Sequence, residues 1–121
     1  MTIEDAVRAF EASNLRVEYH AARDETNFTV RGDPHPPGKY PYTLYFWECW
    51  LSERDSECIV EPPPHQANDQ PLGFVVANLA EAVSLTLYMY DHRLLRERTL
   101  PLEESKEFTQ RLFEKWRECQ R

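Results

Sequence analysis

The chain is poor in glycine and cysteine. Three glycines among 121 residues are too few to suggest a glycine-rich phosphate loop, and the serines occur in no nucleophile-elbow context. The three cysteines, Cys49, Cys58 and Cys119, are an odd number without a CxxC pair, which argues against a disulfide framework and against a zinc site. The sequence therefore predicts no metal, no cofactor and no catalytic residue.

Long apolar runs and a leader of the secretory type are also missing. No uninterrupted apolar run approaches the roughly 20 residues that cross a bilayer, and Met1 to Phe10 contains no basic segment followed by an apolar one. We therefore expect no membrane association and a cytoplasmic location. The content of 41% hydrophobic residues is too high for disorder, and the length suits one domain spanning residues 1–121.

Basic charge is scarce in the first three quarters of the chain. Residues 1–92 contain six Lys/Arg against fifteen Asp/Glu, whereas residues 93–121 contain eight against six. Phosphate backbones are bound by clustered Lys and Arg, so we expect no nucleic-acid partner. An acidic surface suits a protein partner with a basic surface, although the same charge also serves solubility alone.

Hydrophobic periodicity predicts an α+β fold. Residues 2–14 have a helical stripe with Thr2 as the cap and Asn14 at the exit, and four strand-like segments follow at 15–22, 26–32, 40–51 and 57–61. We expect an antiparallel sheet of about four to six strands in a meander. Residues 101–120 predict a C-terminal helix anchored by Trp116, which would pack with the N-terminal helix on one face of the sheet.

Residues 72–100 are ambiguous between helix and strand. The segment "LGFVVAN" is typical of a short buried strand, and Asn78 with Glu81 has the spacing of a helix cap. A tolerable helical stripe is also present, formed by Leu79, Ala82, Val83, Leu87, Tyr90 and Leu94. The alternation and the β-branched and aromatic residues of 83–90 favour a strand slightly, with a short return strand at 94–100.

Two proline-rich loops should meet at one end of such a meander. Residues 32–41 and 61–71 hold eight of the nine prolines, and each loop contains a histidine beside proline, His35 or His65. This geometry predicts a rim of two stiff segments and two imidazoles, which is a candidate partner-binding site. The alternative is that the prolines only hold irregular loops against the domain and the histidines are solvated.

The segment "YPYTLYFWECW", residues 40–50, concentrates six of the fifteen aromatic residues. As a strand it directs Tyr45 and Trp47 to one face and Glu48 and Trp50 to the other, so neither face is polar. We hypothesise that the face with Tyr45 and Trp47 is exposed apolar surface for homodimerisation or for a partner. The alternative is a sheet curled around its own second face.

Glu48 and the two central cysteines carry narrower hypotheses. Glu48 would be held ionised by an arginine such as Arg8 or Arg31, or would be a general-acid candidate if it lay unpaired beside a cleft. A turn centred in "SERDSE" makes Cys49 and Cys58 cross-strand neighbours, which we expect to be two buried thiols rather than a redox pair or a metal site.

Two functions from different classes remain. The first is a non-enzymatic protein-binding module that uses an aromatic sheet face and an acidic rim, with candidate residues Tyr42, Tyr45, Trp47, His35 and His65. In architecture alone such a protein is similar to secretion chaperones and toxin-immunity proteins, a likeness that does not fix function. The second is a small-molecule-binding protein or enzyme with a pocket on the concave sheet, formed by Glu48, Trp50 and a rim histidine. The first needs an exposed patch and the second an enclosed pocket.

Overall fold

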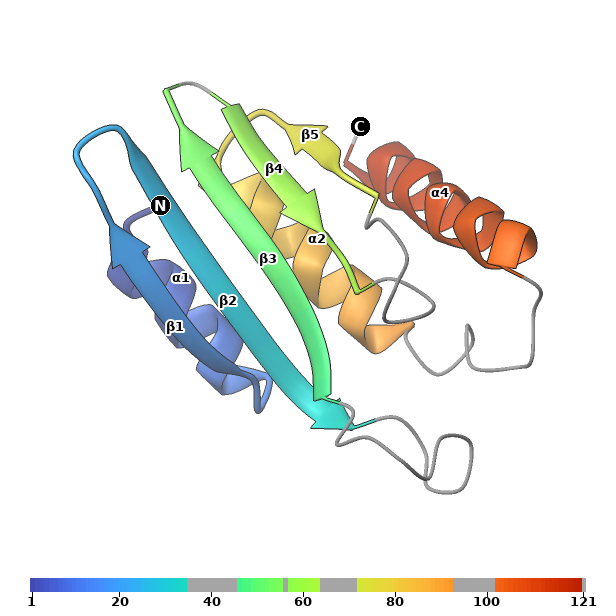
Figure 1. Cartoon of the computed structure of the whole chain (residues 1–121), viewed down its shortest axis with the longest axis horizontal. Coiled ribbons are helices and arrows are strands. Elements are labelled where there is room, and N and C mark those ends of the chain that lie inside the picture. The colour runs from blue at the N-terminus through green and yellow to red at the C-terminus, as the bar shows by residue number, and fades with distance from the viewer. Residues whose placement is uncertain (35–45, 56, 64–71, 93–101, 121) are drawn as a thin grey trace.

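Five antiparallel strands form one sheet with helices packed behind it (Figure 1). The structure is a computed structural model, and it describes residues 1–34, 46–55, 57–63, 72–92 and 102–120. The strands lie side by side in chain order, and each neighbouring pair is antiparallel. The described elements are α1 (Ile3–Ala12), β1 (Arg16–Ala21), β2 (Glu25–Pro34), β3 (Phe46–Arg54), β4 (Glu57–Glu61), β5 (Phe74–Val76), α2 (Leu79–Asp91) and α4 (Leu102–Cys119). The predicted α+β meander is confirmed.

Local signals set both ends of α1. The Thr2 hydroxyl accepts a hydrogen bond from the Asp5 N–H, and the Asp5 carboxylate accepts one from the Thr2 N–H, each at 3.1 Å. This capping box lowers the pKa of Asp5, chiefly through the hydrogen bond from the Thr2 backbone. Asn14 follows the helix with a φ of 62°, a conformation that asparagine tolerates, and Ala6 and Phe10 are buried against the sheet. The predicted cap and exit are confirmed.

The turn between β3 and β4 lies two residues later than the sequence suggested. Arg54 pairs with Glu57, and Asp55 adopts a φ of 54°, which a tight hairpin turn requires. Cys58 therefore lies opposite Glu53 and not opposite Cys49, so the predicted thiol neighbours are wrong. The prediction that both thiols are buried is confirmed, because Cys49 and Cys58 are 0% and 2% exposed.

Residues 79–91 form a helix, so the strand favoured for residues 83–90 is wrong. Asn78 caps α2 by accepting from the Glu81 N–H at 2.9 Å, and the Glu81 carboxylate accepts from the Ala77 N–H at 2.8 Å. The helix packs on β3, β4 and β5, and this burial outweighs the strand propensity of its side chains. The predicted return strand at 94–100 lies outside the described residues.

The core fills the space between the sheet and the helices. Trp47 of β3 meets Tyr90 of α2 edge to face, with the ring centroids 5.0 Å apart, and Gly32 lies directly opposite Trp47 on β2. A Cβ atom at Gly32 would overlap Tyr90, so glycine makes this close approach possible. In α4, Phe113 stacks on Phe74, and Trp116 is 1% exposed with its indole N–H donating to the Ser84 hydroxyl at 2.9 Å. Trp116 is thus the core anchor that the sequence predicted.

Candidate functional site

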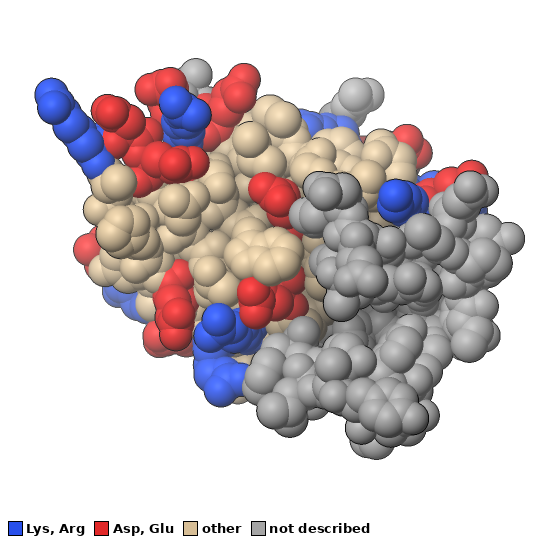
Figure 2. All heavy atoms as spheres, in the orientation of Figure 1, with Lys and Arg blue, Asp and Glu red and all other residues tan. Residues whose placement is uncertain are grey.

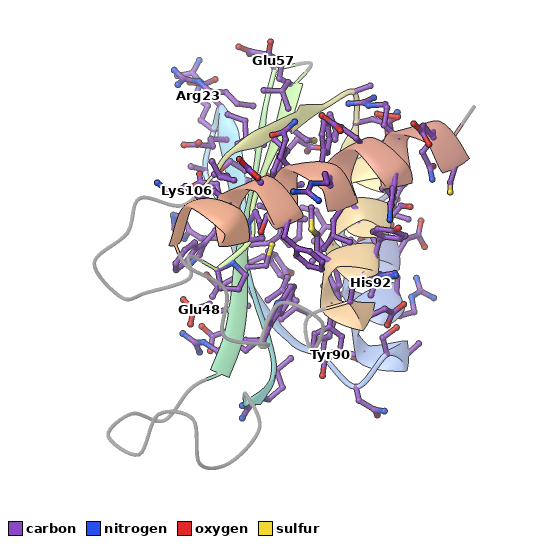
Figure 3. All side chains as sticks on the ribbon, turned by 90° about the vertical axis from the view of Figure 1, so that its right-hand side faces the viewer. Arg23, Glu48, Glu57, Tyr90, His92 and Lys106 are labelled. Atoms are coloured by element: carbon purple, nitrogen blue, oxygen red, sulfur yellow. The ribbon has the colours of Figure 1, made fainter. Side chains whose placement is uncertain are left out.

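Trp47 is on the covered face of the sheet, contrary to its prediction as exposed surface. Its side chain is 2% exposed, because the room left by Gly32 and the contact with Tyr90 place it beneath α2. Glu48 projects from the opposite side of β3, away from the helices, whereas Tyr90 lies on the helix side (Figure 3). In the described part of the chain, no element covers the Glu48 side of the sheet (Figure 1). The alternative prediction, a sheet curled around its own second face, is therefore also wrong for these residues.

The other predicted partner-binding residues lie outside the described part of the chain. These residues are Tyr42, Tyr45, His35 and His65. The strands that lead to the two proline-rich loops do run the same way, as the meander requires. However, β4 ends at Glu61, which pairs with Trp50, while β2 ends beside Phe46. Phe46 and Trp50 are four positions apart on β3, so the two strands end about 13 Å apart along the sheet. The histidine rim stays a prediction.

The uncovered side of the sheet, called here the open face, has an apolar centre. Trp50 is partly exposed and lies between Thr29 of β2 and Glu61 of β4. Ile59 of β4 is diagonal to it, because Ile59 pairs with Ser52, and Ile59 also pairs with Val75 of β5, which is 53% exposed. The strand register places these side chains on the open face: Arg16, Glu18, His20, Glu25, Asn27, Thr29, Arg31, Glu48, Trp50, Ser52, Arg54, Glu57, Ile59, Glu61 and Val75.

Carboxylates outnumber guanidinium groups on the open face. Arg31 donates from Nε to Glu48 Oε2 at 3.1 Å, and its Nη1 lies 3.6 Å from Glu18 Oε1. The predicted pairing of Glu48 with Arg31 is therefore confirmed. Glu61 makes no ion pair with the described residues, although it lies directly opposite Trp50. Glu25 and Glu57 flank the hairpin end, so the described residues of this face include five carboxylates against three arginines.

Among the described residues, two open hollows on this face contain no paired nucleophile and base. One, of about 310 Å³, is lined by Arg16, Glu18, Thr29, Arg31 and Glu48. The other, of about 600 Å³, is lined by Glu25, Ser52, Arg54, Asp55, Glu57, Ile59 and Glu61. The Ser52 hydroxyl in the second hollow donates to Asn27 Oδ1 at 3.0 Å and not to a base. Figure 2 shows the open face toward the viewer, with acidic side chains gathered at one end and more of them beside the uncharged centre.

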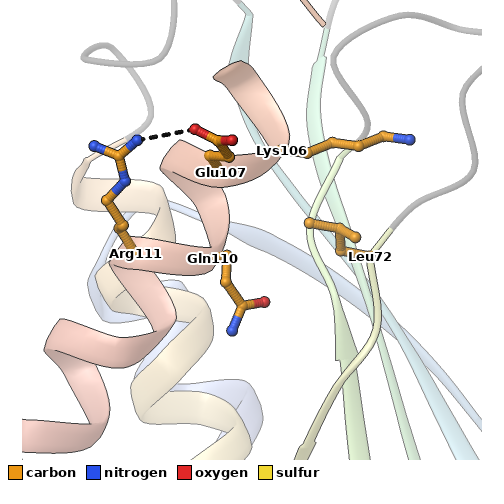
Figure 4. Close-up of a pocket in the computed structure, with 5 residues that line it drawn as sticks. All are labelled: Leu72, Lys106, Glu107, Gln110 and Arg111. Carbon is orange, nitrogen blue, oxygen red and sulfur yellow. Dashed lines mark hydrogen bonds and ion pairs between the residues drawn. The ribbon is translucent and has the colours of Figure 1, made fainter. Parts of the chain in front are cut away.

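A third hollow, of about 370 Å³, lies between α4 and the residues before β5 (Figure 4). Leu72 forms one wall, and Lys106, Gln110 and the ion pair between Glu107 and Arg111 form the other. The Arg111 Nη2 and Glu107 Oε2 atoms are 3.2 Å apart. This hollow was not predicted, and its lining offers charge but no catalytic pair.

The cysteine thiols in the core are not poised for reaction. Burial raises the pKa of Cys49, and burial together with the Glu53 carboxylate raises the pKa of Cys58 to about 11. Both groups are therefore protonated thiols near neutral pH. Within the described ranges, no group of three or more His, Cys, Asp and Glu side chains could hold a metal ion.

Comparison with protein-family models, curated proteins and solved structures gives no match to this chain. None of the described helices is long and apolar enough to cross a membrane. The candidate site therefore depends on the geometry of the open face.

Three residues of the open face were not singled out from the sequence. Ile59, Glu61 and Val75 lie in short strands that the sequence predicted, but their faces were not assigned. The alternation in "ECIVE" separates Cys58 and Val60 from Ile59 and Glu61, so a signal was present. The register that joins these residues to Trp50 follows from the turn at Asp55, and the strand pattern alone does not supply it.

Proposed function

We propose that the protein is a non-enzymatic binding module that engages a basic protein segment through the open face. The observation that carries the proposal is the apolar centre of partly exposed Trp50 and Ile59 and exposed Val75 within a carboxylate-rich sheet surface. The solvent side of an antiparallel sheet is normally polar, so a tryptophan with two aliphatic side chains on the next two strands suits an interface.

The charges around Trp50 favour a cationic partner. A lysine or arginine side chain laid over the indole would gain a cation–π contact, and the Glu61 carboxylate opposite Trp50 would be its counter-ion. Glu48 is already engaged by Arg31, so Glu61 is the acid more available to a partner in the described part of the chain. The remaining acids of the face would steer a basic segment toward this centre.

The same charges disfavour face-to-face pairing of two copies. Two open faces brought together would oppose carboxylates to carboxylates, which costs binding free energy. A basic partner therefore suits this face better than a second copy does. The three unbonded cysteines, of which Cys119 is exposed, suit the reducing cytoplasm that we propose as the location.

The test is binding of synthetic peptides that contain lysine and arginine. A control series of the same length has glutamate in place of each lysine and arginine. Trp47 and Trp116 are buried, so quenching by acrylamide and shifts in emission on binding report mainly on Trp50. Binding of basic peptides, weakened by Trp50→Ala and by Glu61→Gln, is the expected result. Glu114→Gln is the matched control, because it removes an exposed carboxylate from α4 and not from the open face.

Two results would contradict the proposal. One is equal binding of the basic and acidic peptide series, since this would remove the role of the open-face charge. The other is an equal loss of binding in Glu61→Gln and Glu114→Gln, since this would reduce the effect to net charge alone.

A further inference from the structure

The two outer edges of the sheet are protected to different degrees. At the β5 edge, α4 runs alongside, and the Arg117 Nη2 group donates to the Val75 carbonyl at 3.2 Å (Figure 1). The strand there is three residues long. At the other edge, β1 is six residues long and has no neighbour beyond it in the described part of the chain (Figure 1). Unprotected strand edges are ready templates for pairing.

The pairing of β1 with β2 shows which backbone groups of β1 point outward. The Ala22 N–H donates to the Glu25 carbonyl at 2.8 Å, so these two residues form a hydrogen-bonded pair. Such pairs alternate along an antiparallel ladder, so the backbone N–H and C=O groups of Glu18 and His20 point toward β2. The backbone N–H and C=O groups of Val17, Tyr19 and Ala21 therefore point outward from the free edge of the sheet.

Charged side chains protect the β1 edge against pairing only on the open face of the sheet. The charged and titratable residues Arg16, Glu18 and His20 all lie on the open face, and the register with β2 has no bulge. On the helix side, Tyr19 is 52% exposed, and its ring lies 6.1 Å from that of Phe28. The edge contains none of the prolines, lysines or bulges that normally prevent sheet extension.

We propose that two copies of this chain pair through their β1 strands. The strands run antiparallel around a two-fold axis at Tyr19, which joins the two five-stranded sheets into one continuous sheet. Val17 of each copy then pairs with Ala21 of the other, and the two Tyr19 residues pair with each other. Each of these three pairs exchanges two backbone hydrogen bonds, about six in total.

Charge complementarity selects this register over its neighbours. With Tyr19 on the axis, Glu18 of each copy lies opposite His20 of the other on the open face. A shift of two residues in one direction opposes Glu18 to Glu18, and like charges directly opposite one another destabilise strand pairs. The reverse shift opposes His20 to His20 and places Glu18 opposite Ala22, so the contact between Glu18 and His20 is lost. Larger shifts place Tyr19 opposite residues outside β1.

The first test is the mass of the purified chain by sedimentation equilibrium over a range of concentrations. We expect a species of twice 14.4 kDa that dissociates on dilution. Tyr19→Pro removes an outward N–H and no bond to β2, so it should keep the fold and weaken the dimer by about tenfold or more. Tyr19→Phe is the matched control and should keep the dimer. A monomeric mass up to about 1 mM overturns the proposal, as does a dimer with unchanged affinity in a folded Tyr19→Pro variant.

The second test is a charge swap, which stays informative if Tyr19→Pro does not fold. His20→Glu should weaken the dimer by about fivefold, because it places two carboxylates opposite one another, and Glu18→Lys should weaken it because it removes the contact between Glu18 and His20. The double variant should restore the wild-type affinity. A dimer that is strengthened by His20→Glu alone, or that the double variant does not restore, overturns the register.

Amide hydrogen exchange gives a third readout. The amides of Val17, Tyr19 and Ala21 should become protected as concentration rises, whereas those of Glu18 and His20 should be protected in monomer and dimer alike. Protection that rises equally along the whole strand overturns the edge pairing.

Discussion

Trp47 and Trp50 are three residues apart on β3 and lie on opposite faces of the sheet, so they make a matched pair of substitutions. Trp47 is 2% exposed and contacts Tyr90, whereas Trp50 is partly exposed on the open face. Replacing each with alanine removes the same side chain from the same strand. The difference between their free energies of unfolding therefore measures how much the helices covering the Trp47 face contribute to stability.

The expected loss for Trp47→Ala is large. Removing a buried tryptophan costs about 3–5 kcal/mol of the free energy of unfolding, which includes the edge-to-face contact with Tyr90. A domain of this size has a total of about 5–15 kcal/mol, so the variant should be near the limit of folding. Trp50→Ala should cost about 1 kcal/mol, because water already reaches its ring.

Urea denaturation followed by far-ultraviolet circular dichroism measures both losses. With a slope of about 2 kcal/mol per molar urea, the midpoint of Trp47→Ala should fall by about 2 M and that of Trp50→Ala by about 0.5 M. Equal slopes in the two variants would show that the change is in stability and not in the unfolded state. A larger loss in Trp50→Ala than in Trp47→Ala would refute the assignment of the covered face.

Two further substitutions test the core. Gly32→Ala should lower the free energy of unfolding by about 1–3 kcal/mol, because the added methyl group overlaps Tyr90, and thermal denaturation that matches the wild type would contradict this close approach. For Cys58, a folded-state pKa of about 11 against an ordinary 9.0 means that the folded protein keeps a proton which the unfolded chain loses between these values. The contribution of Cys58 to stability is therefore fully present below pH 9 and is lost as pH rises through 11. The free energy of unfolding should fall more steeply with pH over this window in the wild type than in Cys58→Ala. Parallel plots of free energy against pH for the two proteins would contradict this reasoning.

Local sequence signals predicted the parts of the fold that local interactions control. The Thr2 cap, the exit at Asn14 and the strand at residues 57–61 follow from short-range hydrogen bonding and from alternation. The strand favoured for residues 83–90 was wrong because the same residues also fit a helical stripe. The contacts of α2 with three strands and the cap at Asn78 decided between the two patterns.

The face of β3 that carries Trp47 was predicted to be exposed, and this prediction was wrong. Glu48, Trp50 and the pairing with Arg31 were among the expected features. The sequence did not single out Ile59, Glu61 and Val75. Their positions on the open face relative to Trp50 depend on strand register, and an error of one residue in a turn changes that register.

The sequence alone determined that Trp47 and Trp50 point to opposite sides of one strand, since this follows from the period of two in any β-strand. Which side is covered was decided only by the tertiary structure, because both sides carry an aromatic ring. Gly32 leaves room for Trp47 beneath Tyr90, and Arg31 holds Glu48 on the side that faces water. Gly32 and Arg31 both come from β2, which is distant from Trp47 and Glu48 along the chain, and the strand register is what places them directly opposite these two residues.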